Sequence, residues 1–122
     1  MIVPDWAGYL HWRDDFAGAM DPRLYTIDYL DGLILCGAAR FWRSEDAAIV
    51  AELKAFPTGA RAVHGLIAAG DKDGIKALIP LAEQWGREMG CIGAMIDSRP
   101  GWGRELKAAG YRPFQLALWK DL

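Results

Sequence analysis

His64 is the side chain best suited to proton transfer, because a histidine ring ordinarily changes its charge close to neutral pH. It lies in the run 61–68, where alternate residues would share one face of a β-strand. A lone histidine in a strand also has a structural interpretation, as a hydrogen-bonded core or surface residue. From its residue type and position alone, His64 is either a general base or a structural imidazole.

Metal and thiol chemistry are not indicated by the residue pattern. The two histidines and two cysteines are scattered along the chain without the spacing of a metal site. Cys36 and Cys91 lie in apolar stretches, where we expect buried thiols that pack as small hydrophobic side chains. The sequence therefore predicts neither a metal centre nor a nucleophilic cysteine.

Composition predicts one soluble domain over residues 1–122, since a chain of this length can bury a single core. The 14 basic and 16 acidic residues give a net charge of −2, and no Lys/Arg block suits nucleic acid. Residues 1–10 lack a basic start followed by an apolar run. We therefore expect a cytoplasmic protein without a signal peptide, membrane contact or nucleic-acid partner.

The first half of the chain predicts helices followed by an antiparallel meander. Apolar spacing over 4–20 is typical of one or two short amphipathic helices. The dipeptide Asp31-Gly32 favours a tight hairpin turn between two apolar runs. The strands expected in this meander are 24–30, 33–41, 47–56 and 61–68.

After Gly70 the apolar spacing changes to a helical period that ends at Gly90, with Pro80 predicting a kink or a helix start nearby. Pro100 and Gly110 bracket a second, shorter helix. The remaining strands are expected at 91–96 and 114–119. The fold class is α/β, or α+β by strict usage: a mixed, mostly antiparallel twisted sheet of about six strands flanked by helices.

The order of these elements and the local residues from 51 to 122 resemble the GNAT (acyl-CoA N-acyltransferase) fold. The similar segments are 51–57, 66–70, 85–91 and 99–104, followed by Gly110-Tyr111. The chain looks most like short GNAT-like proteins that are common in phages and prophages. The resemblance covers about three fifths of the chain, and it rests on the order of the segments. It implies acetyl-CoA or another acyl-CoA as cofactor and an amine as acceptor.

The resemblance places the pyrophosphate of acyl-CoA at a loop before the helix that ends at Gly90. Backbone N–H groups at a helix N-terminus attract anions, and glycines let a ligand approach the backbone. The loop lacks the leading Arg or Gln of the family, and Asp71 and Asp73 stand where phosphates would lie. Aspartate is also a favoured helix cap, worth roughly 0.5 to 2 kcal/mol, so a structural loop remains an alternative. The implied cofactor-binding residues are Ala68, Ala69, Gly70, Lys72 and Gly74.

The resemblance and the strand alternation together indicate the acid–base residues. The candidate bases are Glu52, His64 and Asp97, all near a cleft between splayed strands. The family's tyrosine, which protonates the departing thiolate, would fall at Leu106, and a leucine cannot donate a proton. Tyr111 or a water is the expected substitute.

Two functions stay open. One is an N-acyltransferase with a degenerate site, and the other is a catalytically inactive GNAT-fold module that binds a protein partner. Trp6 and Trp119 fit either a homodimer or core packing in a monomer.

Overall fold

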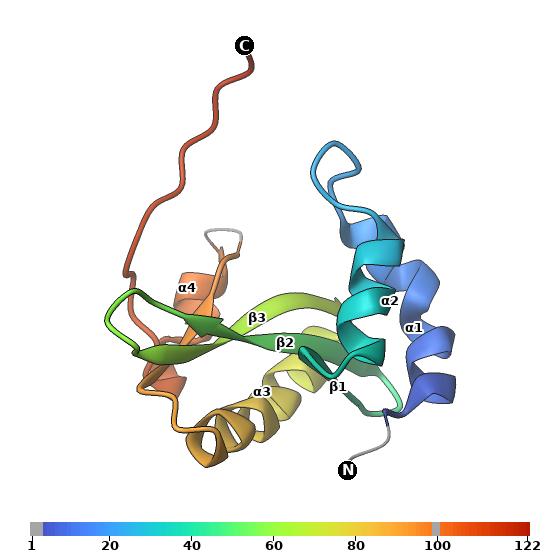
Figure 1. Ribbon diagram of the computed structural model, residues 1–122, viewed down its shortest axis with the longest axis horizontal. Helices are drawn as coiled ribbons and strands as arrows, with labels where there is room; N and C mark the ends of the chain where they lie inside the picture. Colours follow the sequence, from blue (N-terminus) through green and yellow to red (C-terminus); the bar gives the residue numbers. More distant parts are fainter. Residues whose placement is uncertain (1–3, 99–100) are drawn as a thin grey trace.

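The computed structural model describes residues 4–98 and 101–122 and contains a four-stranded sheet with helices on both faces (Figure 1). Strands β1, β2 and β3 are antiparallel, and β4 pairs in parallel with β3. The elements in chain order are α1 (Trp6–Ala19), α2 (Ile27–Leu35), β1 (Ala39–Arg43), β2 (Ala47–Ala55), β3 (Arg61–Gly70), α3 (Lys72–Glu88), β4 (Gly93–Ile96), α4 (Gly101–Glu105) and the short 3₁₀ helix η1 (Lys107–Ala109).

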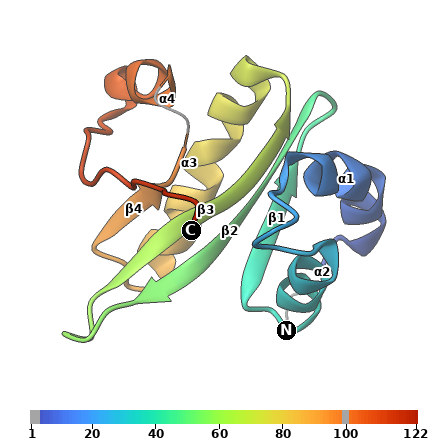
Figure 2. The ribbon, with the colours of Figure 1, turned by 90° about the horizontal axis from the view of Figure 1, so that it is seen from above.

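Strand β2 separates two hydrophobic cores, because successive side chains of a strand point to opposite faces. Ala48 and Val50 pack with the buried aromatic residues Tyr9, Trp12 and Phe16 of α1. The neighbouring residues of β2 pack against α3 instead, and Figure 2 shows α3 on the side of the sheet away from α1 and α2. This second cluster joins Ala47, Ile49, Ala51 and Val63 of the sheet to Ile75, Leu78, Ala82 and Trp85 of α3.

A partly buried polar cluster fixes α1 against α2. The hydroxyl of Tyr9 donates to Oδ1 of Asp31 at 2.6 Å, and Nη2 of Arg13 lies 2.7 Å from Oδ2 of the same carboxylate. The hydrogen bonds from Arg13 hold the pKa of Asp31 below its usual value. Burial, followed by the hydrogen bond to Asp31, raises the pKa of Tyr9. The two helices therefore meet through a polar cluster as well as apolar packing.

The expected hairpin around Asp31-Gly32 is wrong. Residues 27–35 form α2, which is capped by the Thr26 hydroxyl accepting from the N–H of Tyr29. The buried residues Leu30 and Ile34 are four apart and so share one helical face. Asp31 pairs with α1 from inside the helix, and the expected strand 33–41 is reduced to β1, which starts at Ala39.

Most of the other predicted helices and strands are present in the structure. The helix within 4–20 and the strands at 47–56 and 61–68 are confirmed, and the strand at 91–96 is confirmed as the shorter β4. Helix α3 does not begin near Pro80 but continues through it. No strand forms at 114–119, so the described residues contain four strands rather than about six.

Pro100, expected to open the last helix, lies outside the described residues. Cys36, expected to be buried, is exposed at the end of α2, whereas Cys91 is partly buried. Among the helices of residues 4–98 and 101–122, none is long and apolar enough to cross a membrane.

Candidate functional site

A cleft opens where β3 and β4 separate. The two strands pair in parallel only as far as Gly65 and Ile96. At this point the register between β2 and β3 shifts by one residue, so that Leu66 is the extra residue of a β-bulge. A bulge bends its strand and increases its local twist, which accounts for the departure of β3 from β4. The bulge therefore creates the opening.

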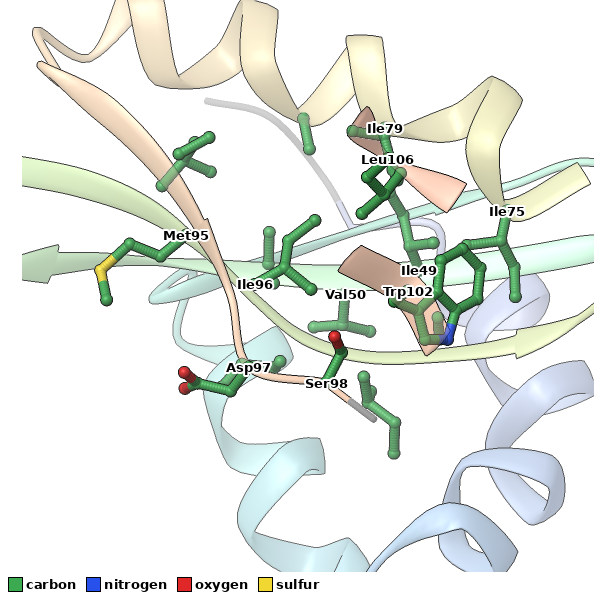
Figure 3. Close-up of a pocket in the computed structure, with 18 of the residues that line it drawn as sticks. Ile49, Val50, Ile75, Ile79, Met95, Ile96, Asp97, Ser98, Trp102 and Leu106 are labelled. Carbon is green, nitrogen blue, oxygen red and sulfur yellow. The ribbon is translucent and has the colours of Figure 1, made fainter. Parts of the chain in front are cut away.

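The cleft holds a mostly apolar cavity of about 430 Å³, a size typical of small-molecule sites. The backbone of β3 after the bulge forms one wall. Gly65 lines the cavity, and an added Cβ there would make ordinary contact with Cγ1 of Ile96 at 3.5 Å, so a larger side chain would extend into the entrance. Figure 3 shows Ile75 and Ile79 of α3, Ile96, Asp97 and Ser98 around the end of β4, and Trp102 and Leu106 from the α4 side.

Three predicted acid–base residues meet beside this cleft. Glu52 of β2 lies directly across the sheet from His64 of β3, and Oε2 of Glu52 is 2.9 Å from Nδ1 of His64. Oδ2 of Asp97, which follows β4, is 2.7 Å from the other ring nitrogen, Nε2. Of the three residues, Asp97 also lines the cavity. The structure thus links the cleft to a buried imidazole.

The contact of a carboxylate with each ring nitrogen of His64 limits where hydrogen atoms can lie. An imidazole donates from both nitrogens only when both carry hydrogen, so the two short contacts require either a charged ring or a protonated carboxyl group. His64 is 9% exposed, whereas the Asp97 side chain is 76% exposed. A proton bound at Asp97 can therefore exchange with solvent or with the ring. Within the described ranges 4–98 and 101–122, no group of three His, Cys, Asp or Glu residues is arranged to hold a metal ion.

Tyr111 occupies the opposite side of the same cavity. Its hydroxyl donates to Oε2 of Glu83 at 2.6 Å, and its backbone N–H donates to the carbonyl of Leu106 at 3.2 Å. Burial, reinforced by the adjacent Glu83 carboxylate, raises the pKa of Tyr111 above its ordinary value. Tyr111 therefore stays protonated and remains a hydrogen-bond donor across the physiological pH range.

Leu106 is buried and lines the cavity directly beside Tyr111.

Glu83 was not predicted as a site residue, although the sequence carries one signal for it. Ile75, Ile79 and Glu83 recur at intervals of four residues, which places them on one face of α3. Glu83 continues the apolar row of Ile75 and Ile79 on α3. Because a carboxylate is unexpected in a closed hydrophobic core, its presence in this row indicates a cavity.

The loop before α3 is closed by its own side chain. Asp71 caps the helix, and its Oδ2 accepts from the N–H of Gly74 at 3.0 Å. Asp73 follows in the first turn. The carboxylate of Asp71 thus accepts the hydrogen bond of a backbone N–H that could otherwise bind a phosphate. The cap explains this aspartate without a ligand.

The two glycines of the loop also have a packing role. Gly70 has a φ of +99°, and a Cβ there would collide with the backbone of Asp46 and Ala47. A Cβ at Gly74 would come within 2.9 Å of the Cβ of Ala47. Both glycines let the loop lie against the start of β2. Their presence therefore does not by itself indicate a cofactor.

Lys72 is directed toward α4. Its Nζ lies 3.1 Å from Oε1 of Glu105, and Nζ of Lys76 lies 3.4 Å from Oε2 of the same residue. The hydrogen bond from Lys72 lowers the pKa of Glu105. Both lysines are partly exposed, so these pairs are open to competition from a charged ligand. Ala68, Ala69 and Gly70, by contrast, line the cavity itself.

No family model and no curated protein sequence matches the chain. Its fold does match solved structures. An acetyltransferase from Trypanosoma brucei has a TM-score of 0.73 at 14% identity, covering 99% of this chain and 97% of that one. Glucosamine-6-phosphate N-acetyltransferase from Arabidopsis thaliana has a TM-score of 0.70 at 11% identity, covering 99% and 95%.

A third similar structure is a predicted acetyltransferase with acetyl-CoA from Clostridium acetobutylicum. It has a TM-score of 0.70 at 12% identity and covers 96% of this chain and 90% of that one. These neighbours are GNAT acetyltransferases, and identities this low establish the fold alone. The chain therefore has the GNAT fold.

Proposed function

We propose that this protein transfers an acyl group from acetyl-CoA or another acyl-CoA to an amine. The observation that carries the proposal is the cleft at the β-bulge at Leu66. Beyond Gly65, β3 stays paired with β2 but has no partner on the β4 side, where it borders a cavity of about 430 Å³. The open edge of such a strand offers N–H and C=O groups to an extended, amide-containing ligand. The pantetheine arm of coenzyme A is such a ligand.

Asp97, His64 and Glu52 supply the acid–base groups. As the amine nitrogen forms its bond to the thioester carbon, a proton passes from nitrogen to the carboxylate of Asp97, which contacts Nε2 of His64. Glu52 positions the ring from the other side. When the C–S bond breaks, the thiolate takes a proton from the hydroxyl of Tyr111 or from water.

The cofactor's pyrophosphate is assigned to the N-terminus of α3, with Lys72 as the nearest cation. Ala68, Ala69 and Gly70 line the cavity and lead along β3 to this helix end, where Gly74 would supply a backbone N–H. To donate to a phosphate, Lys72 must leave Glu105, and the N–H of Gly74 must leave Asp71. This exchange predicts weak binding of acyl-CoA.

One observation favours the second candidate function, a catalytically inactive GNAT-fold module that binds a protein partner. Asp71 already accepts the hydrogen bond of the Gly74 N–H at the start of α3, and Leu106 stands where the family resemblance expects a proton-donating tyrosine. Under this alternative the site is degenerate and acyl-CoA does not bind. A relation to phage or prophage proteins remains a prediction from the sequence resemblance.

Isothermal titration calorimetry with acetyl-CoA tests whether the protein binds acyl-CoA, as the acyltransferase proposal requires and the inactive-module alternative does not. We expect binding that is lost in Gly65→Val, because the added side chain fills the cleft, and weakened in Lys72→Glu. Gly93→Val is the matched control, since a Cβ at Gly93 meets nothing within 4 Å and Gly93 does not line the cavity. Absence of binding to the folded wild-type protein at millimolar acetyl-CoA would refute the acyl-CoA proposal.

Turnover is measured separately, as release of free coenzyme A thiol in the presence of a panel of primary amines. Binding together with thiol release above the rate without amine supports the enzyme. Binding without such release supports a cofactor-binding module that does not catalyse transfer.

A further inference from the structure

The cavity continues past the point at which β3 and β4 separate. The two strands stay paired up to Gly65 and Ile96, and Val63 lies opposite Ala94 inside this paired part. Val63 and Ala94 both line the cavity, and both belong to the hydrophobic cluster that packs against α3. The cavity therefore has an open part, beside the free edge of β3, and a second part over the paired strands beneath α3.

We call this second part the inner pocket and define it by Val63, Ala82, Glu83 and Ala94. Val63 and Ala82 are buried, and Ala94 is half-buried. Alanine at two of these positions leaves space that larger side chains would fill. Because an apolar ligand in contact with these side chains removes apolar surface from water, such a space favours an apolar occupant.

The inner pocket has few hydrogen-bonding groups to offer a ligand. The facing edges of β3 and β4 are paired with each other there, so the backbone groups between them are already used. The side chains of Val63, Ala82 and Ala94 are apolar, and Oε2 of Glu83 accepts from the hydroxyl of Tyr111 at 2.6 Å. Burying an amide without a partner costs free energy. The amides of a pantetheine arm therefore suit the open edge of β3, whereas the inner pocket suits an alkyl chain.

We propose that the acyl donor carries an uncharged aliphatic chain longer than an acetyl group, and that this chain occupies the inner pocket. The inference rests on the proposed acyl transfer. Residues 66–70 of β3 then contact the pantetheine arm, and the thioester lies where the strands meet, at Gly65 and Ile96. An acetyl group has a single methyl group beyond the thioester carbonyl, so it leaves the inner pocket unfilled.

This placement is consistent with the proposed site of proton transfer. Asp97 follows Ile96 directly in the chain and lines the cavity. Its carboxylate therefore lies beside the thioester that the amine attacks, while the acyl chain extends away from it beneath α3. The acceptor amine and the acyl chain consequently do not compete for the same space.

Glu83 makes the inner pocket unfavourable for acyl groups that carry a negative charge. Its carboxylate lines the cavity, as does that of Asp97, and none of the described residues that line the cavity is Lys, Arg or His. A second carboxylate at the end of an acyl chain would meet a like charge where little water remains to screen it. We therefore expect a neutral acyl chain such as butanoyl, rather than succinyl.

Isothermal titration calorimetry without an acceptor amine compares the affinities of acetyl-CoA and butanoyl-CoA. Burial of each added methylene group should raise the affinity about fourfold, so the wild type should bind butanoyl-CoA about 15-fold more tightly than acetyl-CoA. Ala94→Leu fills the inner pocket, and its ratio of the two affinities should fall close to one. Ala55→Leu is the matched control, since this exposed alanine lies on β2 and does not line the cavity. Its ratio should equal that of the wild type.

A second comparison tests the charge of the acyl chain. Succinyl-CoA has an acyl chain of the same length as butanoyl-CoA but ends in a carboxylate, so the wild type should bind it more weakly. The difference should narrow in Glu83→Gln, which removes the opposing charge. Glu88→Gln, an exposed change at the end of the same helix, is the control and should leave the difference unaltered.

The possible failures can be told apart. Equal affinity of the wild type for acetyl-CoA and butanoyl-CoA overturns this inference but leaves the acyl-CoA proposal in place. A chain-length preference that persists in Ala94→Leu, or succinyl-CoA binding as tightly as butanoyl-CoA, also overturns it. If no thioester binds the folded wild type, the proposed function fails and this inference fails with it. Where circular dichroism shows that Ala94→Leu is unfolded, Ala94→Val takes its place.

Discussion

Oε2 of Glu52 lies 2.9 Å from Nδ1 of His64, across adjacent antiparallel strands. This contact fixes the plane of the ring, and with it the direction of Nε2 toward Asp97. Glu52 is partly buried and His64 is buried. Glu52 is therefore a positioning residue, and its effect on proton transfer must pass through the imidazole.

If the protein catalyses acyl transfer, His64→Gln should lower kcat by roughly 10²- to 10⁴-fold, the usual contribution of an acid–base group. The KM for acyl-CoA should change little, because the cavity is lined by Asp97 rather than by the ring. Steady-state kinetics measure both quantities. An unchanged kcat would assign His64 a structural role.

Glu52→Gln should lower kcat less than His64→Gln and should shift the pH–rate profile, since the ring loses one of its two carboxylate partners. Glu45→Gln, an exposed change in the turn before β2, is the control. A purely structural Glu52 would lower stability in chemical denaturation and leave the pH profile of the folded enzyme unchanged.

Stability should fall on the alkaline side. The pKa values of Tyr9 and Tyr111 are raised by burial in the folded protein, so the unfolded chain loses these protons first. Their contribution is complete below the ordinary tyrosine pKa of about 10 and is lost as the pH rises above it. Urea denaturation at pH 8 and pH 11 measures the loss. Tyr111→Phe should reduce this pH dependence, and an unaltered slope would contradict it.

Stability should also fall on the acidic side, through Asp31. Its folded-state pKa is lowered, so the contribution is present above the ordinary aspartate pKa of about 4 and is lost below it. Asp31→Asn should cost about 2 kcal/mol at neutral pH, because Arg13 and the Tyr9 hydroxyl lose a charged partner.

The loss in Asp31→Asn should shrink at pH 3. Asp28→Asn is the matched control, since this exposed aspartate lies on the same helix and contacts the same arginine at 3.4 Å. Equal losses of stability in the two variants would show that burial of Asp31 is unimportant.

Asp71→Ala should have opposite effects on folding and on binding. Loss of the helix cap should lower the free energy of unfolding by about 1 kcal/mol. The N–H of Gly74 then becomes available to a phosphate, so the affinity for acyl-CoA should rise. Calorimetry and denaturation measure the two changes on one protein. Lower stability without tighter binding would separate this loop from cofactor recognition.

The sequence predicted the second half of the fold better than the first. The helix ending at Gly90 and the strands that flank it have clear periods, whereas 24–35 combine strand-forming residues with a turn dipeptide. The structure makes this segment a helix, because Leu30 and Ile34 then face the aromatic core and Asp31 reaches Tyr9 and Arg13. Contacts with α1 outweigh local propensity, and no local pattern reports them.

The candidate acid–base residues were predicted from strand alternation and family resemblance, but their contacts with one another were not. Which ring nitrogen faces Glu52 depends on the register of β2 and β3, and Asp97 comes within reach only because β4 ends beside His64. The bulge at Leu66 was equally hidden. Residues 65–70 are all glycine, alanine, leucine or isoleucine, so no polar residue marks the point at which the alternation of β3 reverses.

Strand β2 is shared by both hydrophobic cores, with Ala48 and Val50 on one side and Ala47, Ile49 and Ala51 on the other. Neither layer of helices can detach without exposing one face of this strand to water. The amide hydrogens of β2 should consequently exchange with solvent only through global unfolding. Loss of either core should bring down the whole domain in one cooperative transition.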